Sequence, residues 1–153
     1  MARRAKAHQQ VKRQRADFHH KVALQLVREN DVIYLEDLQV ANLRHRPTPK
    51  PDGTGGFLPN GATRKAGLNK SISDAGWYHF RLILDYKAAW AGKRVDAIPP
   101  AYTSQDCSGC GERVPKSLSI RTHMCPSCGL VVDRDENAAV NILRAGQARQ
   151  GRA

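Results

Sequence analysis

The sequence lacks a long hydrophobic segment. No apolar run approaches the roughly 18–20 residues that a membrane-spanning helix needs, and no charged segment followed by an apolar stretch opens the chain. We therefore expect an intracellular protein with no membrane partner. The four cysteines are then expected to bind metal instead of forming disulfides, because cytosolic thiols are kept reduced.

Acidic residues are scarce as well. The 153 residues include 25 Lys and Arg against 14 Asp and Glu, which gives a net charge of +11 and a pI near 10.0. Such an excess favours a polyanionic partner, nucleic acid above all, although a basic protein without such a partner remains an alternative. The length allows one domain with a real core, or a small domain with a satellite.

The first segment is free of Pro and Gly. Within residues 1–29, Val11, Phe18, Val22 and Leu26 recur at helical spacing, which predicts a long helix with one apolar face and a basic remainder. That basic surface either contacts nucleic acid or is simply solvated. The candidate contacts on it are Arg13, Arg15 and Lys21.

Two short segments predict strands. Residues 31–38 form a continuous apolar run, typical of a strand that is buried on both faces. Residues 93–100 predict a second strand, stopped by Pro99 and Pro100. A helix predicted between them would complete a βαβ unit with parallel strands and a right-handed crossover.

The segment between the strands divides into two parts. Residues 44–70 are rich in Pro and Gly and predict a flexible basic loop. Residues 71–91 return to helical spacing, with Ser73 as the expected N-cap. The expected apolar face of this helix consists of Ile72, Gly76, Phe80, Ile83 and Trp90.

A pair of metal-binding knuckles follows. Cys107 and Cys110 form one C-x-x-C pair, Cys125 and Cys128 form another, and fourteen residues separate the two. Four thiolates complete the tetrahedral shell of a structural Zn²⁺ ion, with iron or an adventitious ion as the alternative. Such a ribbon, residues 107–129, has almost no core, so metal binding supplies its folding free energy.

The loop between the knuckles is basic. Arg113, Lys116 and Arg121 either contact a phosphate backbone or are solvated. His123 lies beside the second knuckle and is expected to be a bystander, because four cysteines already satisfy the metal.

Two carboxylates stand at positions where catalytic acids occur. Glu36 ends the first predicted strand, and Asp135 opens the last predicted helix. Singly, Glu36 reads as a surface acid and Asp135 as a helix N-cap. Together they suggest a metal-dependent nuclease site, in which Mg²⁺ ions are held between carboxylates. Asp37 and Asp133 are weaker neighbours.

Four segments carry a family resemblance, and they lie between Arg13 and Gly146. They are "FHHKVALQLVRENDVIYLEDLQVANL", "SISDAGWYHFRLILDYKA", "PPAYTSQDCSGCG" and "CPSCGLVVDRDENAAVNIL". In this order they resemble the C-terminal half of TnpB (OrfB), an RNA-guided, RuvC-like nuclease encoded by insertion sequences. The resemblance implies an RNase H fold interrupted by a zinc ribbon, Mg²⁺ or Mn²⁺ as the catalytic ion, and DNA and guide RNA as partners. It also implies a prokaryotic cytoplasmic protein that joins the nucleoid when bound to DNA.

The family site uses three acids, and the resemblance transfers two of them. "LEDL" supplies Glu36 and "DRDENAA" supplies Asp135, while Arg121 resembles an arginine that helps to hold the scissile phosphate. The family's first Asp strand and its three-stranded meander have no counterpart in this sequence.

We therefore expect an α/β chain with a partial RNase H-like (RuvC) fold that lacks its first strands and carries an inserted zinc ribbon with four cysteine ligands. The expected parts are a partial RuvC-like domain over 1–106, the ribbon over 107–129, a final helical segment over 130–146 and a flexible tail over 147–153. The expected function is that of a nucleic-acid-binding, truncated TnpB copy without cleavage activity of its own. The alternatives are a zinc-ribbon nucleic-acid-binding module, or a nuclease completed by a separately encoded N-terminal half or by Asp37 or Asp133.

Overall fold

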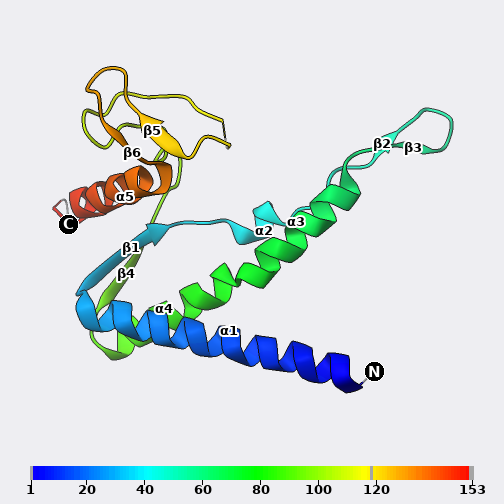
Figure 1. Ribbon diagram of the computed structural model, residues 1–153, viewed down its shortest axis with the longest axis horizontal. Helices are drawn as coiled ribbons and strands as arrows, with labels where there is room; N and C mark the ends of the chain where they lie inside the picture. The colour runs from blue at the N-terminus through cyan, green and yellow to red at the C-terminus, as the bar shows by residue number, and fades with distance from the viewer. Residues whose placement is uncertain (1, 118, 152–153) are drawn as a thin grey trace. The chain divides into compact units, whose positions relative to one another are not determined.

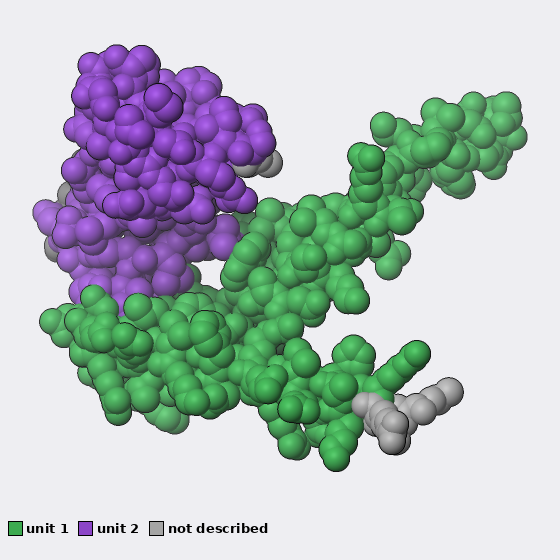
Figure 2. All heavy atoms as spheres, in the orientation of Figure 1, with its two compact units in different colours: residues 1–31, 39–93 green, residues 32–38, 94–153 purple. Residues whose placement is uncertain are grey.

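The computed structural model describes residues 2–117 and 119–151 (Figure 1). The chain is a mixed α/β structure that divides into two compact units (Figure 2). The first unit consists of residues 1–31 and 39–93, and the second of residues 32–38 and 94–153. Within the described residues, no helix is both long and apolar enough to cross a membrane.

The first unit is mainly helical. Its elements are α1 (Ala2–Glu29), α2 (Val40–Leu43), β2 (Lys50–Pro51), β3 (Phe57–Leu58), α3 (Ala62–Ala75) and α4 (Trp77–Trp90). The expectation of one loop over 44–70 is therefore wrong. Its Gly- and Pro-rich part folds into the antiparallel β2–β3 hairpin, and helix α3 begins at Ala62.

Helices α1 and α4 pack along each other and form the core of this unit (Figure 1). The buried positions of α1 are His19, Ala23 and Val27, whereas the predicted stripe residues Val11 and Phe18 are exposed. The apolar face is thus shifted by one residue. Ala23 is small and fully buried, so α1 and α4 can approach each other closely there. The large Phe18 side chain is exposed and does not contribute to this core.

The predicted helix over 71–91 is broken at Gly76. This glycine has φ +68° and separates α3 from α4. A Cβ atom built there would lie 2.8 Å from the His19 ring, so both the backbone and the packing require glycine. Ser73 lies inside α3, where its hydroxyl donates to the Asn69 carbonyl, and the expected N-cap is therefore wrong. Trp90, expected on the apolar face, is 85% exposed.

The second unit contains the strands that were expected to pair. Its elements are β1 (Val32–Glu36), β4 (Arg94–Ile98), β5 (Thr122–Met124), β6 (Val131–Asp133) and α5 (Arg134–Gln150). Strands β1 and β4 are parallel, with Val32 opposite Arg94 and Glu36 opposite Ile98, as the βαβ pattern predicted. All of β1 is half-buried, so the expectation of a strand buried on both faces is wrong.

Helix α5 packs against β1 and β4 and continues through residues 147–150, where the sequence predicted a flexible tail. The contact depends on Gly146. A Cβ atom at Gly146 would lie 2.2 Å from Cδ1 of Tyr34 on β1, because the tyrosine ring lies directly on the helix backbone. This close approach packs the C-terminal part of α5 against the middle of β1.

We therefore expect Gly146→Ala to destabilise the protein by about 1–3 kcal/mol, although alanine favours helix, because the new methyl group forces the Tyr34 ring away. Gly67→Ala in α3 is the matched control. No atom lies within 4 Å of the added Cβ at Gly67, so this change is expected to stabilise by about 0.4–1 kcal/mol. Urea unfolding measures both, and equal effects of the two substitutions would contradict the packing argument.

Candidate metal centre and carboxylate pocket

The four cysteine sulfurs of the ribbon lie close together. Each lies within 4.8 Å of the others, and the Sγ–Sγ distance is 3.6 Å for both Cys107–Cys128 and Cys110–Cys125. A tetrahedral Zn²⁺ ion with Zn–S bonds of about 2.3 Å separates its sulfurs by about 3.8 Å. The set therefore fits a metal of this kind. The group consists of Cys107, Cys110, Cys125 and Cys128.

The thiols respond to one another and to nearby amides. Hydrogen bonds from the backbone amides of Cys128 and Ser127 lower the pKa of the Cys125 thiol to about 7. At Cys110 the amide of Glu112 lowers the pKa, but the side chains of Cys125 and Cys128 outweigh it and raise the pKa to about 12. Four sulfurs this close ionise together only around a cation, which matches the chemistry of a metal site.

His123 lies fully buried on β5. Its Nδ1 contacts the Lys116 ammonium, and burial, followed by the charge of Arg134, lowers the pKa of Lys116. Lys116, one of the predicted nucleic-acid contacts, is therefore half-buried within the ribbon.

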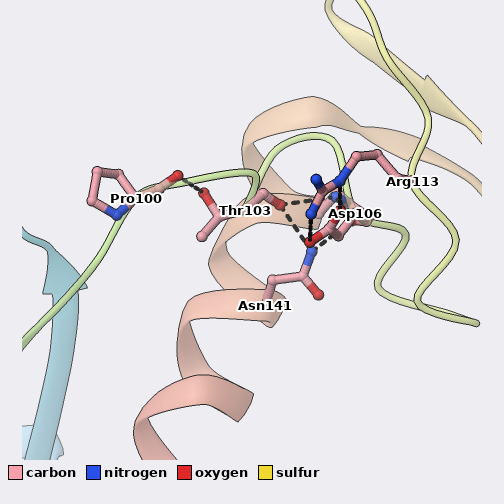
Figure 3. A network of polar contacts seen from close by, with 6 residues as sticks. Pro100, Thr103, Asp106, Arg113 and Asn141 are labelled. Atoms are coloured by element: carbon pink, nitrogen blue, oxygen red, sulfur yellow. Dashed lines mark hydrogen bonds and ion pairs between the residues drawn. The ribbon is translucent and has the colours of Figure 1, made fainter.

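Two asparagines on α5 hold the first knuckle, and the sequence analysis missed them. Asn137 is fully buried, its Oδ1 accepts from the Ser108 amide at 2.8 Å, and its Nδ2 donates to the Asp106 carbonyl at 2.8 Å. One turn later, the Asn141 Nδ2 donates to the Thr103 and Asp106 carbonyls at 2.8 and 2.7 Å (Figure 3). The signal was available, since two Asn four residues apart share one face of a helix.

A third α5 side chain extends this contact. The Arg144 guanidinium donates to the Ser108 carbonyl. Asn137, Asn141 and Arg144 thus form a polar stripe on α5 that binds the backbone of residues 103–108. We call these three residues the α5 clamp. It joins the metal centre to the helix that carries Asp135.

The loop held by the clamp is also braced from its other side. The Arg113 guanidinium pairs with the Asp106 carboxylate at 2.8 Å (Figure 3) and lies 3.6 Å from the centre of the Tyr102 ring. The hydrogen bond to Asp106 raises the pKa of Arg113. Arg113, predicted to contact nucleic acid, thus interacts with Asp106 and Tyr102 of its own chain.

Glu36 and Asp135 line one pocket of about 360 Å³ in the second unit. Glu36 comes from the carboxyl end of β1, Asp135 from the first turn of α5, and the floor is the apolar surface of Ala138 and Ile142. The pocket also contains Ser104 and Arg134. Two acids that are distant in the sequence therefore reach the same cavity.

The N-cap of α5 is Asp133, so the expectation that Asp135 caps this helix is wrong. The Asp133 Oδ1 accepts from the amides of Asp135 and Glu136 at 2.7 and 3.3 Å. Because Asp133 satisfies these amides, the Asp135 carboxylate projects from the helix instead of folding back onto it.

Two arginines neutralise Asp135. The Arg134 Nε lies 3.1 Å from Oδ1, and the Arg121 Nη1 lies 3.9 Å from Oδ2. The ribbon therefore places Arg121, the residue expected near a scissile phosphate, beside the second carboxylate. Arg134 was not predicted.

The remaining candidate contacts lie on α1. Arg15 pairs with Asp74 at 3.5 Å and Lys21 with Asp17 at 2.6 Å, while Arg13 is exposed. Two of these three cations thus have acidic partners within the first unit.

A family model described as "Cas12f1-like, TNB domain" matches residues 77–142. The chain is 39% identical over 135 residues to "Putative RNA-guided DNA endonuclease InsQ" of Escherichia coli K12, covering 88% of this chain and 33% of the relative. A "Putative RNA-guided DNA endonuclease" of Streptomyces pristinaespiralis is 40% identical over 146 residues, which cover 94% of this chain and 31% of the relative. "TnpB-like protein L79" of Acanthamoeba polyphaga mimivirus is 29% identical over 141 residues, which cover 92% of this chain and 24% of the relative. The chain is related to the TnpB-like proteins.

This relationship confirms the resemblance seen in the sequence. The chain spans about a third of the length of the first two relatives. Among solved structures, it is similar to the Cas12f1–sgRNA–target DNA complex (TM-score 0.56, 17% identity, 90% of this chain and 36% of that chain). It is also similar to the mini-RNA-guided endonuclease CRISPR-Cas phi3 (TM-score 0.58, 20% identity, 91% and 20%). At these identities the structures show a shared fold.

The chain is expected to bind one zinc ion through the four cysteines. Chelation should remove the β5–β6 ribbon while the helical far-UV signal of α1, α3 and α4 persists, because the ribbon has little core of its own. Cys110→Ser should lose the metal, whereas the control His123→Gln should keep it. A colorimetric zinc indicator measures the zinc content of each variant. Retention of zinc by Cys110→Ser would contradict the assignment of the four cysteines as zinc ligands.

The α5 clamp allows a second, matched comparison. Asn137→Ala should destabilise the protein by about 2–3 kcal/mol, since it leaves the buried Ser108 amide without an acceptor. Asn141→Ala should cost about 1 kcal/mol or less, because Asn137 still donates to the carbonyls of Thr103 and Asp106. Denaturant unfolding of the zinc-loaded protein measures both. A larger loss for Asn141→Ala would contradict the role given to Asn137.

Proposed function

We propose that this chain is the nucleic-acid-binding C-terminal portion of a TnpB-like RNA-guided DNA endonuclease, with a partial RuvC-type RNase H fold and a structural zinc ribbon. Glu36 and Asp135 are two carboxylates of its metal-dependent cleavage site. The observation that carries this proposal is their meeting in one pocket.

The position of this pocket supports the assignment. It lies at the carboxyl end of a strand in a parallel pair, where ligands and chemistry gather in α/β folds. Carboxylate oxygens are the ligands that Mg²⁺ and Mn²⁺ prefer, so Glu36 and Asp135 are residues of the type that would hold such an ion. When bound, the ions would supply Lewis-acid stabilisation of the attacking and leaving oxygens of a phosphodiester.

The chain's own residues orient this site. Asp133 caps α5 and thereby leaves the Asp135 carboxylate available for a metal ion. Arg121 and Arg134 lie beside Asp135, where a guanidinium would pair with a phosphate oxygen of the bound strand once a metal ion occupies the carboxylate. Ala138 and Ile142 add an apolar surface to the pocket beside these charges.

DNA and a guide RNA are the proposed partners, and the prokaryotic cytoplasm is the proposed location. The net charge of +11 supports a polyanionic partner, since every contact between a cation and a phosphate releases counterions. The relative InsQ is described as an RNA-guided DNA endonuclease, and the Cas12f1 structure contains guide RNA and target DNA.

By itself this chain is proposed to bind nucleic acid without cutting it. The described residues that line the pocket include two carboxylates, whereas the family site uses three. Without the third carboxylate, the positive charge of the metal ions is less well compensated and their positions are less well fixed. A separately encoded N-terminal half would complete the site, and a simple nucleic-acid-binding module is the competing function.

The purified chain is expected to show no Mg²⁺- or Mn²⁺-dependent nicking of plasmid DNA, and to gain it when a polypeptide with the family's first Asp strand is added. Weak Mn²⁺ binding, followed by electron paramagnetic resonance, should fall at least fivefold in Glu36→Gln and Asp135→Asn. Glu136→Gln is the matched control, because Glu136 lies in the same helical turn but does not line the pocket.

Unchanged Mn²⁺ binding in both pocket variants would exclude a metal site and favour the binding module. Nicking by the chain alone, lost in Glu36→Gln, would overturn the claim that this chain is inactive by itself.

A further inference from the structure

A second pocket, of about 690 Å³, lies in the first unit between the end of α2 and the start of α3. We propose that it binds the phosphodiester backbone of a single-stranded nucleic acid. This inference deepens the proposed function, on which it rests for the class of ligand, and it assigns residues outside the carboxylate pocket and the ribbon.

The charge of this pocket is the first argument. Four cations line it, and none of the lining side chains among the described residues is acidic. The cations are Arg44, Arg46, Lys65 and Lys70. Elsewhere in this unit, Arg15, Lys21 and Arg81 pair with aspartates, so the lack of acids here is a local feature. Such a cavity favours an anion with several negative groups.

The start of α3 adds to this field. Asn60 and Ala62 line the pocket, and the fourteen-residue helix begins at Ala62 with no acidic residue in its first turn. Its dipole therefore presents unneutralised positive charge to the cavity.

The backbone that carries Arg44 and Arg46 is held in place before any ligand binds. The Lys65 ammonium contacts the Leu43 carbonyl, and the Asn69 Nδ2 donates to the Arg44 carbonyl at 2.7 Å. On the hairpin side, the Asn60 Nδ2 donates to the Thr48 carbonyl at 3.0 Å. Three side chains from the α3 side thus fix the segment that carries Arg44 and Arg46. Because this segment is already ordered, ligand binding costs less conformational entropy.

Asn69 identifies the kind of anion. Its Oδ1 is a buried atom with no hydrogen-bond partner among the described residues, and its amide orientation is set because the Nδ2 faces a carbonyl. A buried acceptor without a partner is costly, so a ligand donor is expected there. Nucleotides carry such donors beside their phosphates, as ribose hydroxyls and base amino groups. Inorganic phosphate carries the negative charge but has no ribose hydroxyl or base amino group that could donate to the Asn69 Oδ1.

The test is binding of a fluorescein-labelled single strand, as RNA and as DNA of the same sequence, to the full zinc-loaded chain. Arg44→Gln with Arg46→Gln should weaken binding about tenfold or more at 0.1 M salt. It should also lower the slope of log K against log salt by about 1.4, since each single-strand phosphate contact contributes about 0.7. Arg94→Gln with Arg149→Gln is the control with the same change in net charge, and it should leave the slope unchanged.

Asn69→Ala tests the acceptor separately. It should weaken binding severalfold at an unchanged salt slope, because a neutral hydrogen bond is lost and no charge is removed. A stronger effect on RNA than on DNA identifies the donor as a ribose hydroxyl, and equal effects identify a base amino group. Far-UV spectra and unfolding midpoints establish that each variant is folded.

The outcomes separate the two proposals. Failure of the unchanged chain to bind either strand would overturn the nucleic-acid-binding function itself. Tight binding that Arg44→Gln with Arg46→Gln leaves unaltered, in both affinity and salt slope, would overturn the pocket alone. Displacement of the strand by inorganic phosphate at equal concentration would overturn the role given to Asn69.

Discussion

The second unit depends on hydrogen bonds between one helix and one loop. Asn137 is fully buried in α5, and its amide satisfies the Ser108 amide and the Asp106 carbonyl. The loop that carries the first knuckle would otherwise contain buried backbone groups without partners, which cost about 1–3 kcal/mol each. Strands β5 and β6 also contact α5, and the Arg134 amide donates to the Arg121 carbonyl at 2.7 Å. The α5 clamp adds the attachment of the first-knuckle loop, which these strand contacts do not provide.

Helix α5 therefore serves three structures at once. One side of it bears the clamp, Gly146 allows the Tyr34 ring of β1 to lie against its backbone, and its first turn presents Asp135. Since the helix is fixed at its start by the clamp and near its end by Tyr34, the Asp135 carboxylate is held in position relative to Glu36 by packing. Precise placement of a carboxylate is what a metal site requires.

The chain uses its positive charge in two ways. In the second unit, arginines lie beside acids and aromatic rings, as Arg113 does with Asp106 and Tyr102. In the first unit, the pocket between α2 and α3 gathers cations without lining acids. Paired cations brace a fold, whereas unpaired ones that converge on a cavity are available to a polyanion. The net charge of +11 does not distinguish these uses, and only the placement of each side chain does.

The sequence by itself determined the features that rest on local spacing. The C-x-x-C pairs predicted the cysteine cluster, because their spacing reflects ligand geometry directly, and the apolar runs predicted the two parallel strands, although not their burial. Contacts between distant segments were decided by the tertiary structure alone. Gly76 breaks a predicted helix because the His19 ring occupies the space of a Cβ atom, and Asp133 takes the capping role expected of Asp135 because β6 ends at that residue. Likewise, the meeting of Glu36 with Asp135 and the clamp of Asn137 on Ser108 join segments that no local pattern links.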